Sequence, residues 1–180
     1  MAGKRQIVLL RGINIGPNNR IPMPALRERL TGAGFADVRT YVQSGNVVLT
    51  SDATPGALAK QCEELIAAEF GLTIPVVTRT RAELAAVVRR DPLGGVAEDP
   101  KRYQVSFLSA KPGPAVVRKL ESLAAGDERF TAVGREFYTW HAAGVARSKL
   151  WAAIAGKGLG VTATSRNWTT VTTLLQMADE

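Results

Sequence analysis

The sequence predicts an α+β protein made of two ferredoxin-like halves, in which each antiparallel sheet is covered by helices. Three observations lead to this fold class. Residues 5–80 show the order strand, helix, strand, strand, helix, strand, which is the split βαβ order. Residues 101–141 begin a similar order again, and the turn-rich stretch 91–100 lies between the two.

The first half carries hydrophobic patterns typical of strands and others typical of helices. Short apolar or β-rich runs predict four strands, and two stripes with apolar residues three or four positions apart predict helices. Gly34 and Gly71 end the two helices. The expected elements are a strand at 5–11, a helix at 22–33, strands at 38–42 and 46–50, a helix at 58–70 and a strand at 73–80.

The second half repeats the first in outline, although no sequence repetition is detectable. The expected elements are a connecting helix at 81–90, a strand at 103–109, a helix after Pro112, strands at 128–133 and 136–141, and two final helices. In the last helix, apolar residues from Trp168 to Ala178 fall on one face, which therefore packs inward. We accordingly expect a first half at 1–90, a hinge at 91–100 and a second half with C-terminal helices at 101–180.

Length and composition limit the class of protein. With 180 residues, 46% of them hydrophobic and 22% charged, the chain is expected to fold without a stabilising disulfide or metal. Cys62 is the only cysteine and His141 the only histidine, which excludes an internal disulfide and a histidine zinc site. We therefore expect no metal and no cofactor, an inert buried thiol at Cys62, and a structural or solvated His141.

Hydropathy and cysteine use predict a cytoplasmic protein with no membrane partner. No apolar run approaches the roughly 20 residues that a membrane span requires. The apolar run after Lys4 and Arg5 is shorter than the core of a signal peptide. A single cysteine fits a reducing compartment.

The net charge is +7, and the excess of positive charge is larger in the second half. Residues 1–100 hold 12 basic and 10 acidic side chains, whereas residues 101–180 hold 11 and 6. Such a bias attracts polyanions, but it is also an ordinary means of staying soluble. Charge therefore leaves nucleic acid open as a partner without requiring it.

Three blocks join an unusual polar cluster to a strand or a helix: residues 10–23 with RGIN, residues 39–49 with QSGN, and residues 162–174 with SRNW. On these blocks the chain resembles the uncharacterised bacterial domain-of-unknown-function family numbered 1697, over essentially its whole length. The resemblance implies a two-part α+β fold with ferredoxin-like halves, and no activity that can be transferred. The matching positions are Arg11, Gly12, Asn14, Gly16, Asn19, Gln43, Ser44, Gly45, Asn46, Lys149, Thr164, Arg166, Asn167 and Trp168.

The first block predicts a loop suited to an anion. Arg11, Asn14, Asn19 and Arg20 lie in a polar segment that leads into a helix N-terminus, where free backbone amides and the helix dipole favour negative charge. The alternative is that the asparagines adopt positive φ angles and bond their own backbone. Both interpretations stay open. The pattern is neither a P-loop nor a dinucleotide fingerprint.

The second block adds Gln43, Ser44 and Asn46 as candidates. They are expected at the same edge of the sheet as Arg11, where they would contribute polar groups to one site. A tight turn at Gly45 explains much of the same cluster without any ligand. The turn is the favoured interpretation.

The third block predicts another helix start. Thr164 or Ser165 is expected to cap the final helix, which would place Arg166 and Asn167 in its first turn. An arginine there opposes the helix dipole and calls for an anion, and Lys149 is a further cation for the same group.

These candidates support three functional hypotheses. The first is a module that binds a phosphate-bearing ligand, either a nucleotide metabolite or a nucleic-acid backbone. The second is an enzyme of unknown reaction that polarises an anionic substrate, with Lys149 as the acid or base. The third is a protein–protein interaction module. Three questions stay open: whether the protein is an enzyme, whether the RGIN and SRNW blocks share one site, and which oligomeric state it adopts.

Overall fold

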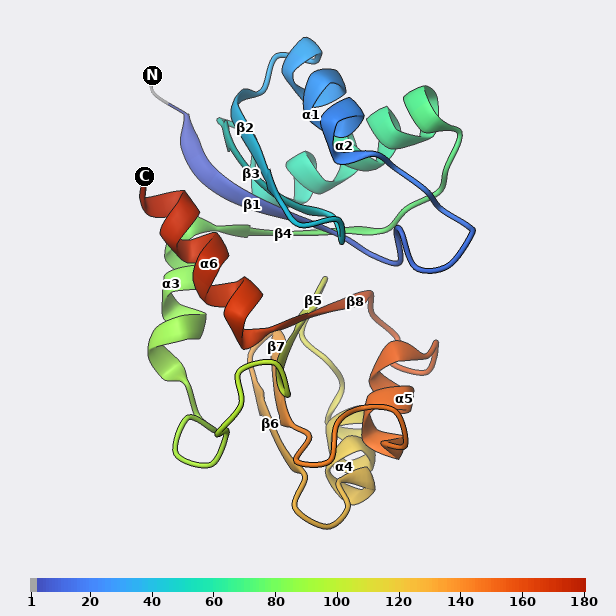
Figure 1. Cartoon of the computed structure of the whole chain (residues 1–180), viewed down its shortest axis with the longest axis vertical. Coiled ribbons are helices and arrows are strands. Elements are labelled where there is room, and N and C mark those ends of the chain that lie inside the picture. The colour runs from blue at the N-terminus through green and yellow to red at the C-terminus, as the bar shows by residue number, and fades with distance from the viewer. Residues whose placement is uncertain (1–2) are drawn as a thin grey trace. The chain divides into compact units, whose positions relative to one another are not determined.

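The computed structural model describes residues 3–180 and divides the chain into two compact units (Figure 1). The first unit holds the chain up to Ala86 together with Thr173–Glu180, and the second unit is Val87–Thr172. The division falls inside two helices, α3 (Arg81–Arg90) and α6 (Trp168–Asp179). The expected hinge at 91–100 stays a prediction.

The first unit contains a four-stranded antiparallel sheet with two helices on one face (Figure 1). Its strands lie in the order β2-β3-β1-β4, so the first strand of the chain is central. This βαββαβ arrangement is the ferredoxin-like one. The elements are β1 (Lys4–Leu10), α1 (Met23–Gly32), β2 (Ala36–Tyr41), β3 (Asn46–Ser51), α2 (Pro55–Phe70) and β4 (Val76–Thr80).

Side chains along β1 point alternately to the two faces of the first sheet. Val8 and Leu10 point to the helix-covered face, where they join a core with α1 and α2. Ile7 and Leu9 point to the other face and are also fully buried. Because both faces of β1 exclude water, its sequence is a continuous apolar run and does not alternate with polar residues.

Two arginines hold the C-terminal end of the chain within the first unit. Arg39 on β2 donates to the carbonyl of Met177 and pairs with Glu180 at 2.6 Å. Arg81 pairs with Asp179, also at 2.6 Å. These contacts explain why residues 173–180 belong to the first unit, although they follow the second unit in the sequence.

The second unit repeats the same architecture. Its antiparallel sheet has the order β6-β7-β5-β8, and α4 and α5 pack against one face of it through Leu120, Leu150 and Phe137. The elements are β5 (Tyr103–Leu108), α4 (Pro114–Leu123), β6 (Arg129–Val133), β7 (Glu136–Trp140), α5 (Lys149–Ala155) and β8 (Ala163–Asn167).

The predicted fold class is confirmed, and β8 is the element that the sequence patterns do not reveal. Residues 163–167 form an edge strand paired with β5, and α6 begins only at Trp168. The expected helix cap at Thr164 or Ser165 is therefore wrong. The strand ATSRN lacks the large apolar side chains that mark a strand, so its pairing with β5 decides its conformation.

Candidate functional site

Hydrogen bonds of Asn14 join the two ends of the connection between β1 and α1, residues 11–21. We call this connection the Asn14 loop. The Asn14 side chain donates to the Ile21 carbonyl and accepts from the Ile21 amide, both at 2.9 Å. The Asn14 amide donates to the Asn19 carbonyl at 3.0 Å. Asn14 and Asn19 have left-handed φ angles of 54° and 53°. Both are therefore turn residues that bond the backbone of their own loop.

The turn between β2 and β3, residues 42–46, is bonded to the Asn14 loop; we call it the Gly45 turn. Asn14 Nδ2 donates to the Gln43 carbonyl at 2.7 Å. Gly45 has a φ of 83°, and a Cβ atom there would lie 2.6 Å from Cβ of Leu10. Only glycine allows this close approach, which brings the two polar segments together.

Two of the candidates in the Gly45 turn have structural roles. Asn46 is fully buried, and its Nδ2 donates to the Tyr41 carbonyl at 3.1 Å and to Ser44 Oγ at 2.9 Å. These bonds fix the shape of the turn. These bonds fit the favoured interpretation of this block, a tight turn, and ligand contacts from Gln43, Ser44 and Asn46 stay a prediction.

Hydrogen-bond donors remain on the surface of the Asn14 loop. The exposed backbone amides of Gly12, Ile15, Gly16 and Asn18 have no acceptor among residues 3–180. Arg20 is exposed, and within that range its side chain forms neither an ion pair nor a hydrogen bond. Arg11, half-buried at the start of the loop, adds a second positive charge.

No carboxylate of the local sequence offsets that charge. The Asn14 loop and the Gly45 turn, residues 11–21 and 42–46, hold two arginines, Arg11 and Arg20, and no acidic residue. The loop therefore combines free donors with positive charge, which is the composition that an anion requires.

Replacing Asn14 tests whether its side chain holds the loop. Asn14→Ala removes three hydrogen bonds and places alanine at a positive φ, so we expect a loss of about 2 kcal/mol in the free energy of unfolding. Asn14→Gly keeps the φ angle accessible and should lose less. Urea denaturation measures both. Asn18→Ala, at an exposed position of the same loop, is the control, and an equal effect at Asn18 would contradict the role of Asn14.

The other three candidates lie in the second unit, and the structure does not bring Lys149 and Arg166 together. Lys149 is exposed at the first residue of α5, which packs on the face of the second sheet that carries Leu108 and Phe137. Arg166 pairs with Val105 across the ladder, which places its side chain on the opposite face. Asn167 caps α6, since its Oδ1 accepts from the Thr170 amide at 2.9 Å.

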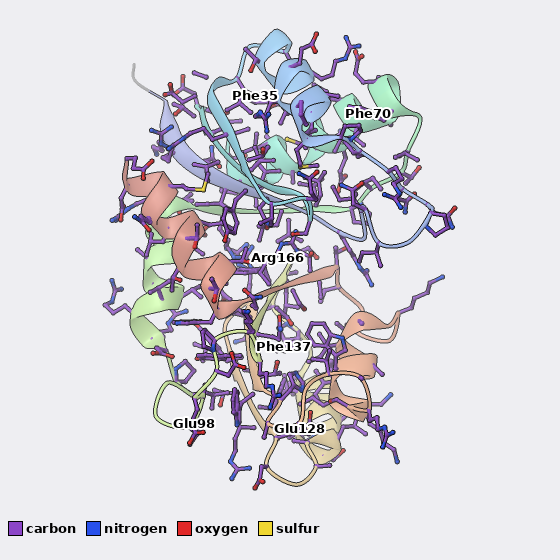
Figure 2. All side chains as sticks on the ribbon, in the orientation of Figure 1. Phe35, Phe70, Glu98, Glu128, Phe137 and Arg166 are labelled. Atoms are coloured by element: carbon purple, nitrogen blue, oxygen red, sulfur yellow. The ribbon has the colours of Figure 1, made fainter. Side chains whose placement is uncertain are left out.

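Arg166 is a strand residue and does not lie in a helical turn, so the expected conflict with the helix dipole does not exist. It is 8% exposed (labelled in Figure 2), and its Nη1 donates to Thr164 Oγ1 at 2.7 Å and to the Ser165 carbonyl at 2.9 Å. Burial lowers the pKa of Arg166 to about 10. The guanidinium stays charged at neutral pH.

A cluster around Glu128 is the feature that sequence reasoning missed. His141 is fully buried, and its Nδ1 lies 2.6 Å from Glu128 Oε2 while its Nε2 lies 2.9 Å from Thr139 Oγ1. Ser148 Oγ donates to the same Glu128 oxygen at 2.5 Å and caps α5 by accepting from the Trp151 amide. His141 and Ser148 are 13 and 20 positions from Glu128 in the sequence, so no local pattern links them to it.

The arrangement of this cluster is not that of a catalytic triad. In a triad the histidine contacts the serine, whereas here Glu128 lies between Ser148 and His141. Both ring nitrogens of His141 are already bonded. The structural alternative for His141 is therefore confirmed, and the cluster offers a fixed carboxylate and no activated nucleophile.

Within residues 3–180, no group of three or more His, Cys, Asp or Glu side chains is arranged to hold a metal ion. Cys62 is buried on α2, and burial raises the pKa of its thiol to about 12, which keeps it in the unreactive form. None of the helices in the described range combines the length and apolar character that a membrane crossing requires.

Fold and site together define an α+β protein of two βαββαβ units, the first of which carries a donor-rich, electropositive loop. The chain belongs to the family described as protein of unknown function (DUF1697), whose model matches residues 4–138. The blocks around Asn14 and Gly45 lie inside this match. Lys149, Arg166 and Asn167 lie beyond it.

A solved structure supports the two-part fold. The chain is similar to the conserved bacterial protein SP0830 from Streptococcus pneumoniae, with 24% sequence identity and a TM-score of 0.76. The similarity covers 97% of this chain and 98% of that chain. It therefore includes both units and establishes the fold alone. Among curated proteins, none matches the chain.

Proposed function

We propose that the protein is a cytoplasmic module whose first unit binds a phosphate-bearing ligand at the Asn14 loop. The observation that carries the proposal is the surface of the loop: it holds exposed backbone amides without an acceptor among residues 3–180, together with Arg20, whose exposed side chain has no partner in that range. Charge-assisted bonds from such donors are shorter and stronger than bonds between neutral groups. Phosphate, with several acceptor oxygens, matches several donors at once.

Rigidity of the loop supports the same ligand. Three bonds from Asn14 and the close approach at Gly45 hold the donors in place before any ligand arrives. Preorganised donors avoid the entropic cost of ordering a loop on binding. The structural role of the asparagines and an anion-binding role of the loop are therefore compatible.

Both phosphate sources in the proposal, a nucleotide metabolite and a nucleic-acid backbone, present the same oxygens to the loop. Base stacking on β5 is not part of the proposal, because Tyr103 and Phe107 on this strand are buried. A nucleic acid would accordingly be held through its backbone, with affinity that falls steeply as salt rises.

Binding measurements on the full chain test the proposal. Isothermal titration with inorganic pyrophosphate, ATP and a short single-stranded RNA, at low and physiological salt, should give saturable binding for at least one of them. Arg20→Ala should weaken that binding about tenfold, because it removes a charge-assisted donor. Amide resonances of Gly12 and Gly16 should shift on titration.

The matched control is Arg118→Ala, which removes the same charge from an exposed position on α4 in the second unit. It should leave binding unchanged. Equal weakening by Arg20→Ala and Arg118→Ala would mean that net charge attracts the anion and would refute a site at the loop. Absence of saturable binding by all three ligands would do the same.

One observation favours a second candidate, an interaction module. Ile15 in the Asn14 loop is 77% exposed, and Val42 in the Gly45 turn is 50% exposed with a left-handed φ of 49°. A β-branched residue at a positive φ is strained, and such strain is retained mainly where the surrounding structure enforces it. Failure of every phosphate ligand in the titrations would leave this protein-binding alternative as the better explanation of the loop.

A further inference from the structure

The second unit contains a pocket of about 440 Å³ beside Glu128, at a distance in the sequence from every residue of the proposed phosphate site. Its volume lies within the range of pockets that bind small molecules. Small residues form much of its wall, namely Ala125, Ala143, Gly144 and Ala146. They leave the polar character of the pocket to Glu128, Ser148 and Arg147.

Glu128 (labelled in Figure 2) lines this pocket, and hydrogen bonds hold its carboxylate in one orientation. Its Oε2 accepts from Ser148 Oγ at 2.5 Å and contacts Nδ1 of His141 at 2.6 Å. A nitrogen that faces a carboxylate at this distance carries a hydrogen, so the ring donates. Among residues 3–180, Oε1 accepts from the Ala125 amide alone, at 3.3 Å, which leaves one of its acceptor positions unused in that range.

The charge of Glu128 is not neutralised by a lysine or arginine. Among residues 3–180 its one ion-pair partner is His141, and Arg147 at the pocket forms no ion pair with it. Burial raises the pKa of Glu128, but the hydrogen bonds from Ser148, His141 and Ala125 lower it by more, so the pKa lies below its ordinary value. The side chain is 12% exposed and carries a negative charge at neutral pH.

We propose that this pocket binds a small molecule through an ammonium group, which donates to Glu128 Oε1 while the rest of the ligand occupies the space between the small residues. Three fixed donors hold the carboxylate, so it need not reorganise when the ligand binds. Among residues 3–180 no lysine or arginine pairs with this partly buried carboxylate, and its one ion-pair partner, His141, contacts Oε2, so a ligand that brings a cation to Oε1 adds an attraction that the protein does not supply there. A neutral ligand of the same shape would lack that gain.

Three probes of similar size separate charge from hydrogen bonding. n-Butylammonium supplies a cation with N–H donors, n-butanol supplies a neutral donor, and tetramethylammonium supplies a cation without donors. Titration of the full chain, followed by amide resonances of Ala125, Gly144 and Ser148, should show saturable shifts with n-butylammonium in the millimolar range. We expect binding of n-butanol and of tetramethylammonium to be at least about tenfold weaker.

Two variants place the probe in the pocket. Glu128→Gln should abolish the preference for n-butylammonium, although it also weakens the cluster. Ala146→Leu fills the pocket from an exposed wall position without touching the bonds of Glu128, and it should abolish binding in a folded protein. Glu121→Gln, which removes one exposed carboxylate from α4, is the control and should bind normally.

Equal binding of n-butanol and n-butylammonium would overturn the proposal, and so would unchanged n-butylammonium binding in Ala146→Leu. Absence of any saturable shift with n-butylammonium would overturn it as well. None of these outcomes bears on the phosphate titrations, because those use other ligands and variants in the first unit.

Discussion

Replacing Glu128 by alanine is expected to lower the free energy of unfolding by about 3–5 kcal/mol, the largest effect among the substitutions considered. The variant removes a carboxylate that accepts three hydrogen bonds, which come from Ser148, His141 and the Ala125 amide. His141 is fully buried in the intact protein, and its Nδ1 would lose the acceptor that Glu128 supplies. Urea denaturation followed by fluorescence gives the change in midpoint.

Asp127→Ala is the matched control for this prediction. It removes the same charge from the neighbouring exposed residue, whose side chain has no hydrogen bond or ion pair in the described part of the chain. Its effect should stay within about 0.5 kcal/mol. A comparable loss at both positions would show that the bonds of Glu128 contribute little beyond its charge.

Acid dependence provides a second readout for the same cluster. The pKa of Glu128 is lower in the folded protein than in the unfolded chain, where it is near 4.5. The ionised carboxylate therefore stabilises the fold fully above the unfolded pKa, and this stabilisation is lost as the pH falls through the folded pKa. The difference in stability between the wild type and Glu128→Gln should therefore shrink as the pH falls below about 4.5. A difference that grows on acidification over this window would mean that the pKa is raised.

The Asn14 loop can be predicted from the sequence and the Glu128 cluster cannot, for a physical reason. The Asn14 loop is contiguous, and its asparagines and glycines are residue types that tolerate left-handed backbone, so the sequence itself indicates a structured polar loop. Glu128, His141 and Ser148 meet only because the fold brings together the start of β6, the end of β7 and the start of α5. Nothing near any one of them in the sequence indicates the other two.

The fold shows the same contrast between local and tertiary causes. Seven of the eight strands and all six helices are expected from local sequence patterns. The exception is β8, whose inward-facing Ser165 meets Ser106 Oγ at 2.6 Å across the ladder. A polar contact inside a sheet leaves no hydrophobic pattern. The interpretation of Arg166 failed for the same reason, because it depended on where this strand ends.

Gly45→Ala is expected to cost about 3 kcal/mol in the free energy of unfolding, and its cause is steric as well as conformational. The φ of 83° by itself costs alanine about 1–2 kcal/mol. The new Cβ would also lie 2.6 Å from Cβ of Leu10 and 3.0 Å from Cδ1 of Ile13, and overpacking a core adds about 1–3 kcal/mol. Neither Leu10 nor Ile13 can move away freely, because both are buried.

Two further glycines separate these contributions. Gly16 has a φ of 69° with open space around its Cβ position, so Gly16→Ala should show the conformational cost alone, about 1 kcal/mol. Gly56 lies in the first turn of α2, also with open space, and Gly56→Ala should be neutral or stabilise by about 0.5 kcal/mol. Urea midpoints should therefore rank Gly56→Ala first, then Gly16→Ala, then Gly45→Ala. If Gly45→Ala and Gly16→Ala lost equal stability, the contact of Gly45 with Leu10 would not be what brings the turn and the loop together.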